Sequence, residues 1–110
     1  MKLKGSLTVF EKPLRMLGLA TKAGKVITGA ELSQKADRDG KAKLIIIAKD
    51  AKNSTKKEFC NAKSHVIELG TKESLGKMTG KDIRSVVSVT DKGFAEVILK
   101  EAGKLNVTEN

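Results

Sequence analysis

The chain has 110 residues, a hydrophobic fraction of 39%, and 22 Lys and Arg against 13 Asp and Glu, for a net charge of +9. This length fits a single domain over residues 1–110, with an ordered core expected at about 9–103. The charge predicts salt-sensitive attraction to polyanions, with nucleic acid as the first partner class and acidic membrane as the second. No apolar run approaches the roughly 18 residues of a membrane span, and the signal-peptide pattern is absent, so we expect a cytoplasmic protein.

The first helix is expected to start near Glu11, because Pro13 is the only proline and favours the first turn of a helix. Gly24 closes this helix. Apolar residues at helical spacing form its inward stripe: Leu14, Leu17 and either Ala20 or Thr21.

The next segments alternate between strand and helix. A brief strand at residues 26–27 leads to a second helix at about 29–39, which stops at Gly40. Residues 43–49, KLIIIAK, form a short β-branched run that predicts a strand buried on both faces. A third helix then ends near Phe59.

The C-terminal part continues this alternation. Residues 65–69, HVIEL, predict a strand, Thr71 caps a short helix, and residues 85–90, SVVSVT, predict the last strand. Asp91 caps the final helix, which ends at about Gly103. The inward stripe of this helix is expected to be Phe94, Val97 and Ile98. The pattern predicts an α/β sandwich with a mainly four-stranded sheet covered on both faces.

No catalytic, metal or cofactor site is expected. His65, the only histidine, is expected to start a strand, and Cys60, the only cysteine, to be a small buried hydrophobe. Nothing supplies a third group to orient these two side chains at a readable spacing. The glycines lack nucleotide-binding spacings and are interpreted as turn and cap residues: Gly70, Gly76 and Gly80.

Aromatic side chains are scarce, with only Phe10, Phe59 and Phe94 in the chain. Proteins that bind single strands usually offer aromatic platforms on which bases stack. An RNA partner is therefore expected to be a folded element, read through its shape, its backbone and a few polar contacts.

Four segments occur in a characteristic order: LGLATKAGKVITG, GKAKLIIIAKDA, GTKESLGKMTGK and SVVSVTDKGFA. Together they resemble the superfamily of kink-turn RNA-binding ribosomal proteins, of the large-subunit L-seven-Ae and L-thirty-e type. The resemblance covers about residues 12–102. The first segment and VTDKGFA are most similar to the bacterial YlxQ-like branch.

This resemblance implies a three-layer α/β/α sandwich with a small, mixed sheet. It also implies a non-catalytic function: binding and stabilising a sharply bent, structured RNA duplex whose bend is flanked by sheared G·A pairs. The partner would be such a kink-turn RNA, in association with the ribosome, and the protein would be a monomer. The alternative is a protein-interaction module of the same fold that does not read RNA specifically.

In the family, the opening of the second helix enters the major-groove side of the G·A pairs. Its glycine is matched by Gly29, followed by Ala30. Many members then have Asn and Glu, where this chain departs with Glu31 and Leu32. Glu31 still accepts hydrogen bonds from a guanine edge, whereas Leu32 does not and is expected to face the core.

Two further regions carry over from the family. Lys35, one turn into the helix, would reach a phosphate or a base, and Lys25 and Lys22 are weaker candidates beside the same turn. A second contact loop maps to residues 81–86, where an exposed apolar side chain would pack on an extruded base and an arginine would meet phosphate: Ile83, Arg84, Ser85 and Val86.

Each of these assignments has a plain structural alternative. Thr28 and Glu31 fit a capping box, in which both side chains bond to backbone N–H groups of the same helix. Lys35 would then be part of a solvated helix face. Ile83 and Val86 would be core residues, and we expect this for at least one of them.

Overall fold

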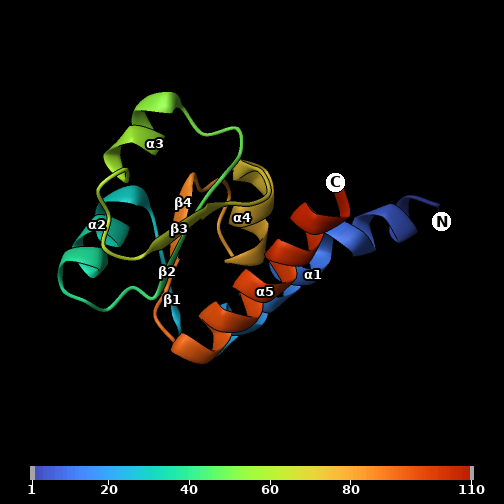
Figure 1. Cartoon of the computed structure of the whole chain (residues 1–110), viewed down its shortest axis with the longest axis horizontal. Coiled ribbons are helices and arrows are strands. Elements are labelled where there is room, and N and C mark those ends of the chain that lie inside the picture. The colour runs from blue at the N-terminus through green and yellow to red at the C-terminus, as the bar shows by residue number, and fades with distance from the viewer. Residues whose placement is uncertain (1, 110) are drawn as a thin grey trace.

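The computed structural model describes the backbone of residues 2–109 and the side chains of residues 12–104 (Figure 1). The elements in chain order are α1 (Lys2–Lys22), β1 (Val26–Thr28), α2 (Ala30–Arg38), β2 (Leu44–Ile47), α3 (Asn53–Glu58), β3 (His65–Glu68), α4 (Lys72–Met78), β4 (Val86–Val89) and α5 (Lys92–Glu109). The predicted alternation of helix and strand is confirmed. No helix of the described residues is both long and apolar enough to cross a membrane.

The four strands form one mixed sheet in the order β1-β4-β2-β3. β2 runs parallel to β3 and antiparallel to β4, and β4 runs antiparallel to β1. Leu44 of β2 thus pairs with His65 on one side and Val89 on the other. β2 and β4 are fully buried, as the apolar run at residues 43–49 predicted for β2.

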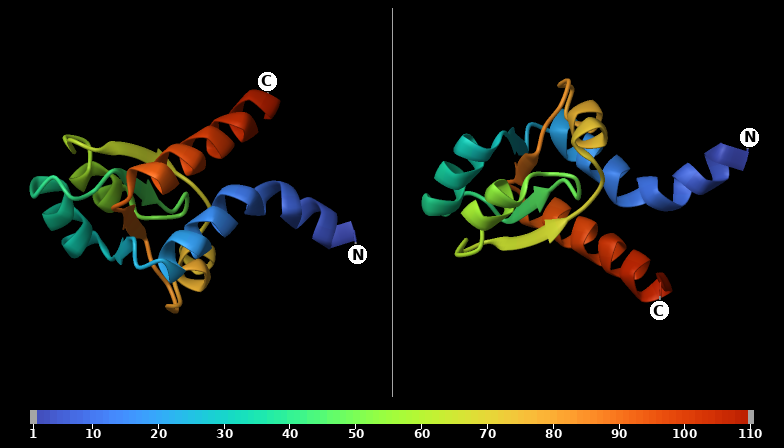
Figure 2. Two further views of the ribbon diagram at one scale, coloured as in Figure 1. Left: turned by 90° about the horizontal axis from the view of Figure 1, so that it is seen from below. Right: turned by 90° about the horizontal axis from the view of Figure 1, so that it is seen from above.

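Helices cover both faces of this sheet (Figures 1 and 2). α1, α4 and α5 form one layer, in which α1 packs against both other helices. α2 and α3 lie on the opposite face, and α2 packs against β1 and β4. The expected three-layer α/β/α sandwich is confirmed.

One buried carboxylate fixes α2 to the segment before β3. Asp37 accepts hydrogen bonds from the backbone N–H of Lys63 at 3.0 Å, and from the N–H and hydroxyl of Ser64 at 2.8 and 2.6 Å. Burial alone raises the pKa of Asp37, but these hydrogen bonds and the charge of Lys63 outweigh it and hold the pKa below its ordinary value. The anchor holds α2 against the sheet.

Both long helices extend further than their sequence signals predicted. α1 begins at Lys2 instead of near Glu11, so Pro13 lies inside it. The helix bends instead of stopping (Figure 2), and the buried Pro13 ring packs in the core at the loss of one backbone hydrogen bond. α5 continues through Gly103 to Glu109, since one glycine lowers helix stability by only about 1 kcal/mol and does not by itself end a helix.

Two further side chains lie elsewhere than expected. Val97 is 41% exposed, while Ala95 and Ile98 occupy the inward positions of α5. Cys60 is exposed and was wrongly expected to be buried, because the turn that follows α3 lies on the surface. The interior position there belongs to Phe59.

Candidate nucleic-acid interface

α2 opens at Gly29, directly beside the start of β4. Gly29 has φ 102° and ψ 147°, a backbone conformation that strongly favours glycine. Its N–H donates to the carbonyl oxygen of Val86 at 2.8 Å, and its carbonyl accepts from the N–H of Ser33 at 3.0 Å. A Cβ on Gly29 would meet no atom within 4 Å, so the requirement for glycine comes from conformation and not from crowding within the protein.

The first turn of α2 presents three backbone donors. In the described part of the chain, the N–H groups of Ala30, Glu31 and Leu32 have no hydrogen-bond partner. Unpaired N–H groups and the helix dipole together make such an opening attractive to acceptor atoms and anions.

The Glu31 carboxylate lies at the same opening and is exposed. The capping-box alternative is wrong, because Thr28 pairs with Val87 as part of β1 and Gly29, one residue later, is the N-cap. No side chain caps α2. Since no hydrogen bond or ion pair joins Glu31 to another described residue, its carboxylate can accept from a ligand.

Leu32 lies on the surface, 58% exposed, although the sequence predicted that it faces the core. The buried positions of α2 are Ser33, Ala36 and Asp37, which share one helix face at the spacing i, i+3, i+4. Ser33 donates to the hydroxyl of Ser88 at 3.2 Å across the layer contact. The sequence did not predict this buried face of α2, because its residues are small or polar and not large and apolar.

A second surface comes from the loop between α4 and β4. Ile83 is 57% exposed, whereas Val86 is fully buried as the first residue of β4. The expectation that at least one of these two is a core residue is therefore confirmed. Arg84 donates through its guanidinium to the carbonyl of Ile83 at 2.7 Å, and its N–H donates to the carbonyl of Lys72 at 3.0 Å. The half-buried Ser85 accepts from the N–H of Ala48 at 2.8 Å through its carbonyl oxygen.

Gly76 sets the position of this loop. It is a buried residue inside α4, not the turn residue that the sequence suggested. A Cβ there would lie 2.6 Å from the carbonyl carbon of Asp82 and 2.9 Å from the nitrogen of Ile83. The N–H of Lys81 also donates to the carbonyl of Gly76 at 2.7 Å. The backbone of the loop thus rests directly on α4, which holds Ile83 outward.

The two surfaces meet at one end of the sheet. The bond between Gly29 and Val86 joins the α2 opening to the strand that follows the Ile83 loop. Lys25 lies at the other end of β1, and the extended chain between Lys25 and Gly29 is roughly 13 Å long. The fold therefore brings together the α2 opening and the Ile83 loop but leaves Lys25 apart.

Lys35 lies one turn along α2 and points toward the end of that helix. Its ammonium forms an ion pair with Asp39 at 2.8 Å. The hydrogen bond and positive charge of Lys35 lower the pKa of Asp39. A phosphate must compete with this exposed, weak pair to reach Lys35.

Comparison with known proteins agrees with this architecture. Residues 12–99 match the model of the ribosomal protein L7Ae/L30e/S12e/Gadd45 family. The chain belongs to this family. The RNA-binding protein YlxQ of Bacillus subtilis is 39% identical over 88 residues, covering 76% of this chain and 88% of that protein. The large ribosomal subunit protein eL8 of Cenarchaeum symbiosum is 31% identical over 110 residues, covering 89% and 87%. The resemblance predicted from the four sequence segments is confirmed.

Solved structures of similar proteins share the family fold. A protein of unknown function from Bacillus halodurans is 34% identical with a TM-score of 0.77, covering 82% of this chain and 95% of that chain. The 15.5 kD RNA-binding protein of Giardia lamblia, at 22% identity, has a TM-score of 0.67 and covers 86% of this chain and 84% of that chain. The second likeness is one of fold alone.

Proposed function

We propose that this protein binds a structured, sharply bent RNA of the kink-turn type and stabilises the bent form without catalysing a reaction. The relatives described as RNA-binding and ribosomal proteins support an RNA partner within or near the ribosome. Such a partner places the protein in the cytoplasm, where it acts as a monomer. The net charge of +9 supplies the long-range attraction.

One observation carries the proposal: the α2 opening offers free donors and a free acceptor beside an exposed apolar side chain. The N–H groups of the first turn suit acceptor atoms of phosphates and bases. The Glu31 carboxylate suits the N–H edge of a guanine in a G·A pair. Ile83 gives an apolar surface against which an extruded base packs.

Leu32 changes the contact at one position of this surface. Where many family members present a carboxylate, this chain presents an exposed apolar side chain next to Glu31. Leu32 accepts no hydrogen bond, so recognition of the bend relies on Glu31 and on apolar contact with a base or ribose. We therefore expect a stronger dependence on the shape of the bend than on the identity of the second base pair.

The proposed mechanism is a population shift. A bent RNA crowds its phosphates and is less populated at low counterion concentration than the open form. A basic protein that fits only the bent form raises its population by the difference in binding free energy between the two forms. No covalent step is required.

The test compares two RNAs of equal length, one with a bend flanked by G·A pairs and one a straight duplex. We expect at least roughly tenfold tighter binding to the bent RNA at moderate ionic strength, corresponding to one or two specific contacts. Fluorescence anisotropy measures both affinities, and energy transfer between dyes at the two RNA ends reports bending. Equal affinity for the two RNAs would refute the proposal.

A further inference from the structure

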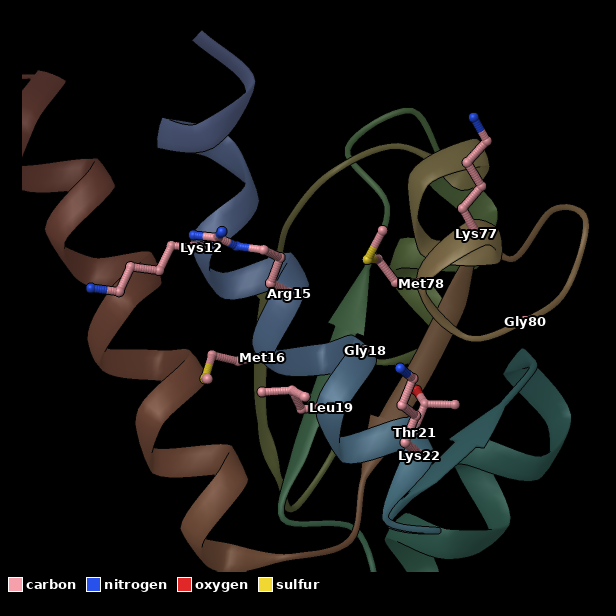
Figure 3. A pocket seen from close by; sticks show the side chains of 10 residues that line it. All are labelled: Lys12, Arg15, Met16, Gly18, Leu19, Thr21, Lys22, Lys77, Met78 and Gly80. Carbon is pink, nitrogen blue, oxygen red and sulfur yellow. The ribbon is translucent and has the colours of Figure 1, made fainter. Parts of the chain in front are cut away.

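A groove separate from the α2 opening and the Ile83 loop lies on the other side of the sheet from α2. This open groove of about 700 Å³ runs between α1 and the end of α4 (Figure 3). Its lining comes from these two helices and the turn after α4: Lys12, Arg15, Met16, Gly18, Leu19, Thr21, Lys22, Lys77, Met78 and Gly80. Of the residues considered for RNA contact, only the weaker candidate Lys22 lies in it.

The floor of the groove is apolar. Leu19 is 51% exposed, although Leu17 and Ala20 of the same helix are fully buried. Gly18 faces α4, and a Cβ there would be in ordinary van der Waals contact with the sulfur of Met78, at 3.6 Å. Methionine adapts its shape to irregular apolar partners, and covering Leu19 would remove apolar surface from water. A single exposed leucine is common on protein surfaces and does not by itself indicate a partner. The charged residues around Leu19 give the additional evidence for one.

The rim of the groove is cationic. Four of the lining residues are Lys or Arg, and none is Asp or Glu. Lys12 has an ion pair with Glu101 at 3.6 Å. For Arg15, Lys22 and Lys77, the described part of the chain provides no ion pair. The rim therefore keeps three cations without an acidic partner among the described residues.

Apolar floor and cationic rim together define the partner. The complement is a segment with apolar side chains on one face and carboxylates beside them, as in helices that bind grooves through spaced anchors. An RNA duplex matches the rim but not the floor, because the ribose-phosphate backbone that it presents is strongly hydrated and would leave the apolar floor uncovered. The location of the groove, across the sheet from α2, leaves that helix accessible when the groove is filled.

We propose that the α1/α4 groove docks an acidic, amphipathic segment of a partner protein. Apolar side chains of the segment cover Leu19 and Met78, and its carboxylates pair with Arg15, Lys22 and Lys77. The protein would then bind RNA at the α2 opening and another protein at the groove, which lies on the other side of the sheet from α2. This docking does not depend on the RNA having a kink-turn.

The test uses a fluorescein-labelled helical peptide in which leucine recurs at spacings of about three and four residues and glutamate fills the other positions. A second peptide carries glutamine in place of glutamate. We expect the glutamate peptide to bind, the glutamine peptide to bind several-fold more weakly, and the amide NMR shifts to change in α1 and α4. No binding, equal binding of the two peptides, or shifts confined to α2 would overturn the proposal.

Matched variants locate the contacts. Arg15→Glu with Lys77→Glu is expected to weaken the glutamate peptide at least about fivefold, as expected for two exposed charge contacts. The same charge change at Lys41 and Lys57, on the surface outside the groove, should have a smaller effect. Leu19→Ser should weaken binding, whereas Val97→Ser on α5 should not. Urea midpoints check that each variant is folded, and equal effects of groove and control variants would refute the groove.

Two other occupants are distinguished by the same variants. If Arg15→Glu with Lys77→Glu weakens the bent RNA as strongly as it weakens the peptide, the groove belongs to the RNA and the proposal fails. If sedimentation shows a dimer that Leu19→Ser dissociates, a second copy fills the groove and the proposal also fails. Loss of preference for bent RNA with peptide binding intact would refute only the proposed RNA function.

Discussion

The Glu31 carboxylate is free to contact a ligand because α2 is capped at Gly29 and not at Thr28. A cap at Thr28 would have occupied the Glu31 carboxylate, but the helix begins one residue later, at a glycine with positive φ. The side chain of Glu31 is left exposed and without a partner among the described residues. The sequence spacing of a capping box was present, yet the pairing of Thr28 with Val87 in the sheet took precedence.

The substitution Glu31→Gln tests this carboxylate. We expect affinity for bent RNA to fall roughly tenfold, because the neutral amide has one fewer strong acceptor and loses the charge-assisted hydrogen bond. Anisotropy titration with the bent and straight RNAs measures the change. Stability to urea should be unchanged. A destabilised variant with undiminished RNA preference would instead assign Glu31 a structural role.

The substitution Ile83→Ser tests the apolar contact. Affinity for bent RNA should fall several-fold, because the extruded base loses its apolar surface. Val97→Ser is the matched control, since Val97 is also exposed but lies on α5, outside the α2 opening and the Ile83 loop. Similar losses in the two variants, measured by the same titration, would argue against a specific contact at Ile83.

At the scale of elements, backbone packing places the two contact surfaces. The Ile83 loop rests on Gly76 of α4, and α2 is held at Asp37 by the segment before β3. Neither constraint could be inferred from the sequence, because a glycine inside a short helix and an aspartate in an amphipathic one have many possible roles. Only the positions of Asp82 and Ser64 in space show what each residue does.

The substitution Gly76→Ala should displace the Ile83 loop. The added Cβ meets the backbone of Asp82 and Ile83, which cannot move aside as a side-chain end would. A loss of about 1–3 kcal/mol in the free energy of unfolding is expected, with weaker binding to bent RNA. Gly103→Ala is the control, because a Cβ there meets nothing within 4 Å. Unchanged stability and unchanged binding would show that the loop is not fixed by this contact.

Asp37→Asn should destabilise the protein by about 1–3 kcal/mol at neutral pH, since the amide turns a donor toward backbone N–H groups. Because the folded pKa of Asp37 is lowered, its stabilisation is present above the ordinary value of 3.8 and is lost as pH falls through the folded pKa. Urea midpoints across this range should therefore converge for variant and wild type at acid pH. Asp39→Asn, on the exposed end of α2, should change little, and a constant difference at all pH values would contradict the Asp37 anchor.

At the scale of the whole molecule, the net charge and the layered architecture contribute differently to binding. The net charge of +9 favours polyanions everywhere, and the sandwich separates the α2 side from the α1, α4 and α5 side. General attraction therefore comes from composition, while discrimination depends on which charges lie beside a shaped surface.

The salt dependence of RNA binding tests this division. Lys35→Ala should reduce the slope of log affinity against log salt by about one and weaken bent and straight RNA by different factors. Lys100→Ala on α5 should leave the slope for bent RNA nearly unchanged, because its surface faces away from α2. An unaltered slope in the Lys35 variant would remove this residue from the RNA interface.

The sequence by itself determined the elements with strong periodic signals and the family. The apolar run of β2, the Thr71 and Asp91 caps and the four ordered segments are local properties, and local backbone preferences suffice to read them. The tertiary structure alone decided the ends of α1 and α5, the exposure of Leu32 and the roles of Gly76 and Asp37. The roles of Gly76 and Asp37 depend on neighbours distant in sequence, which no local pattern shows. The two long helices continue through a proline and a glycine, whose local costs of about 3 and 1 kcal/mol favour an end to the helix but do not impose one.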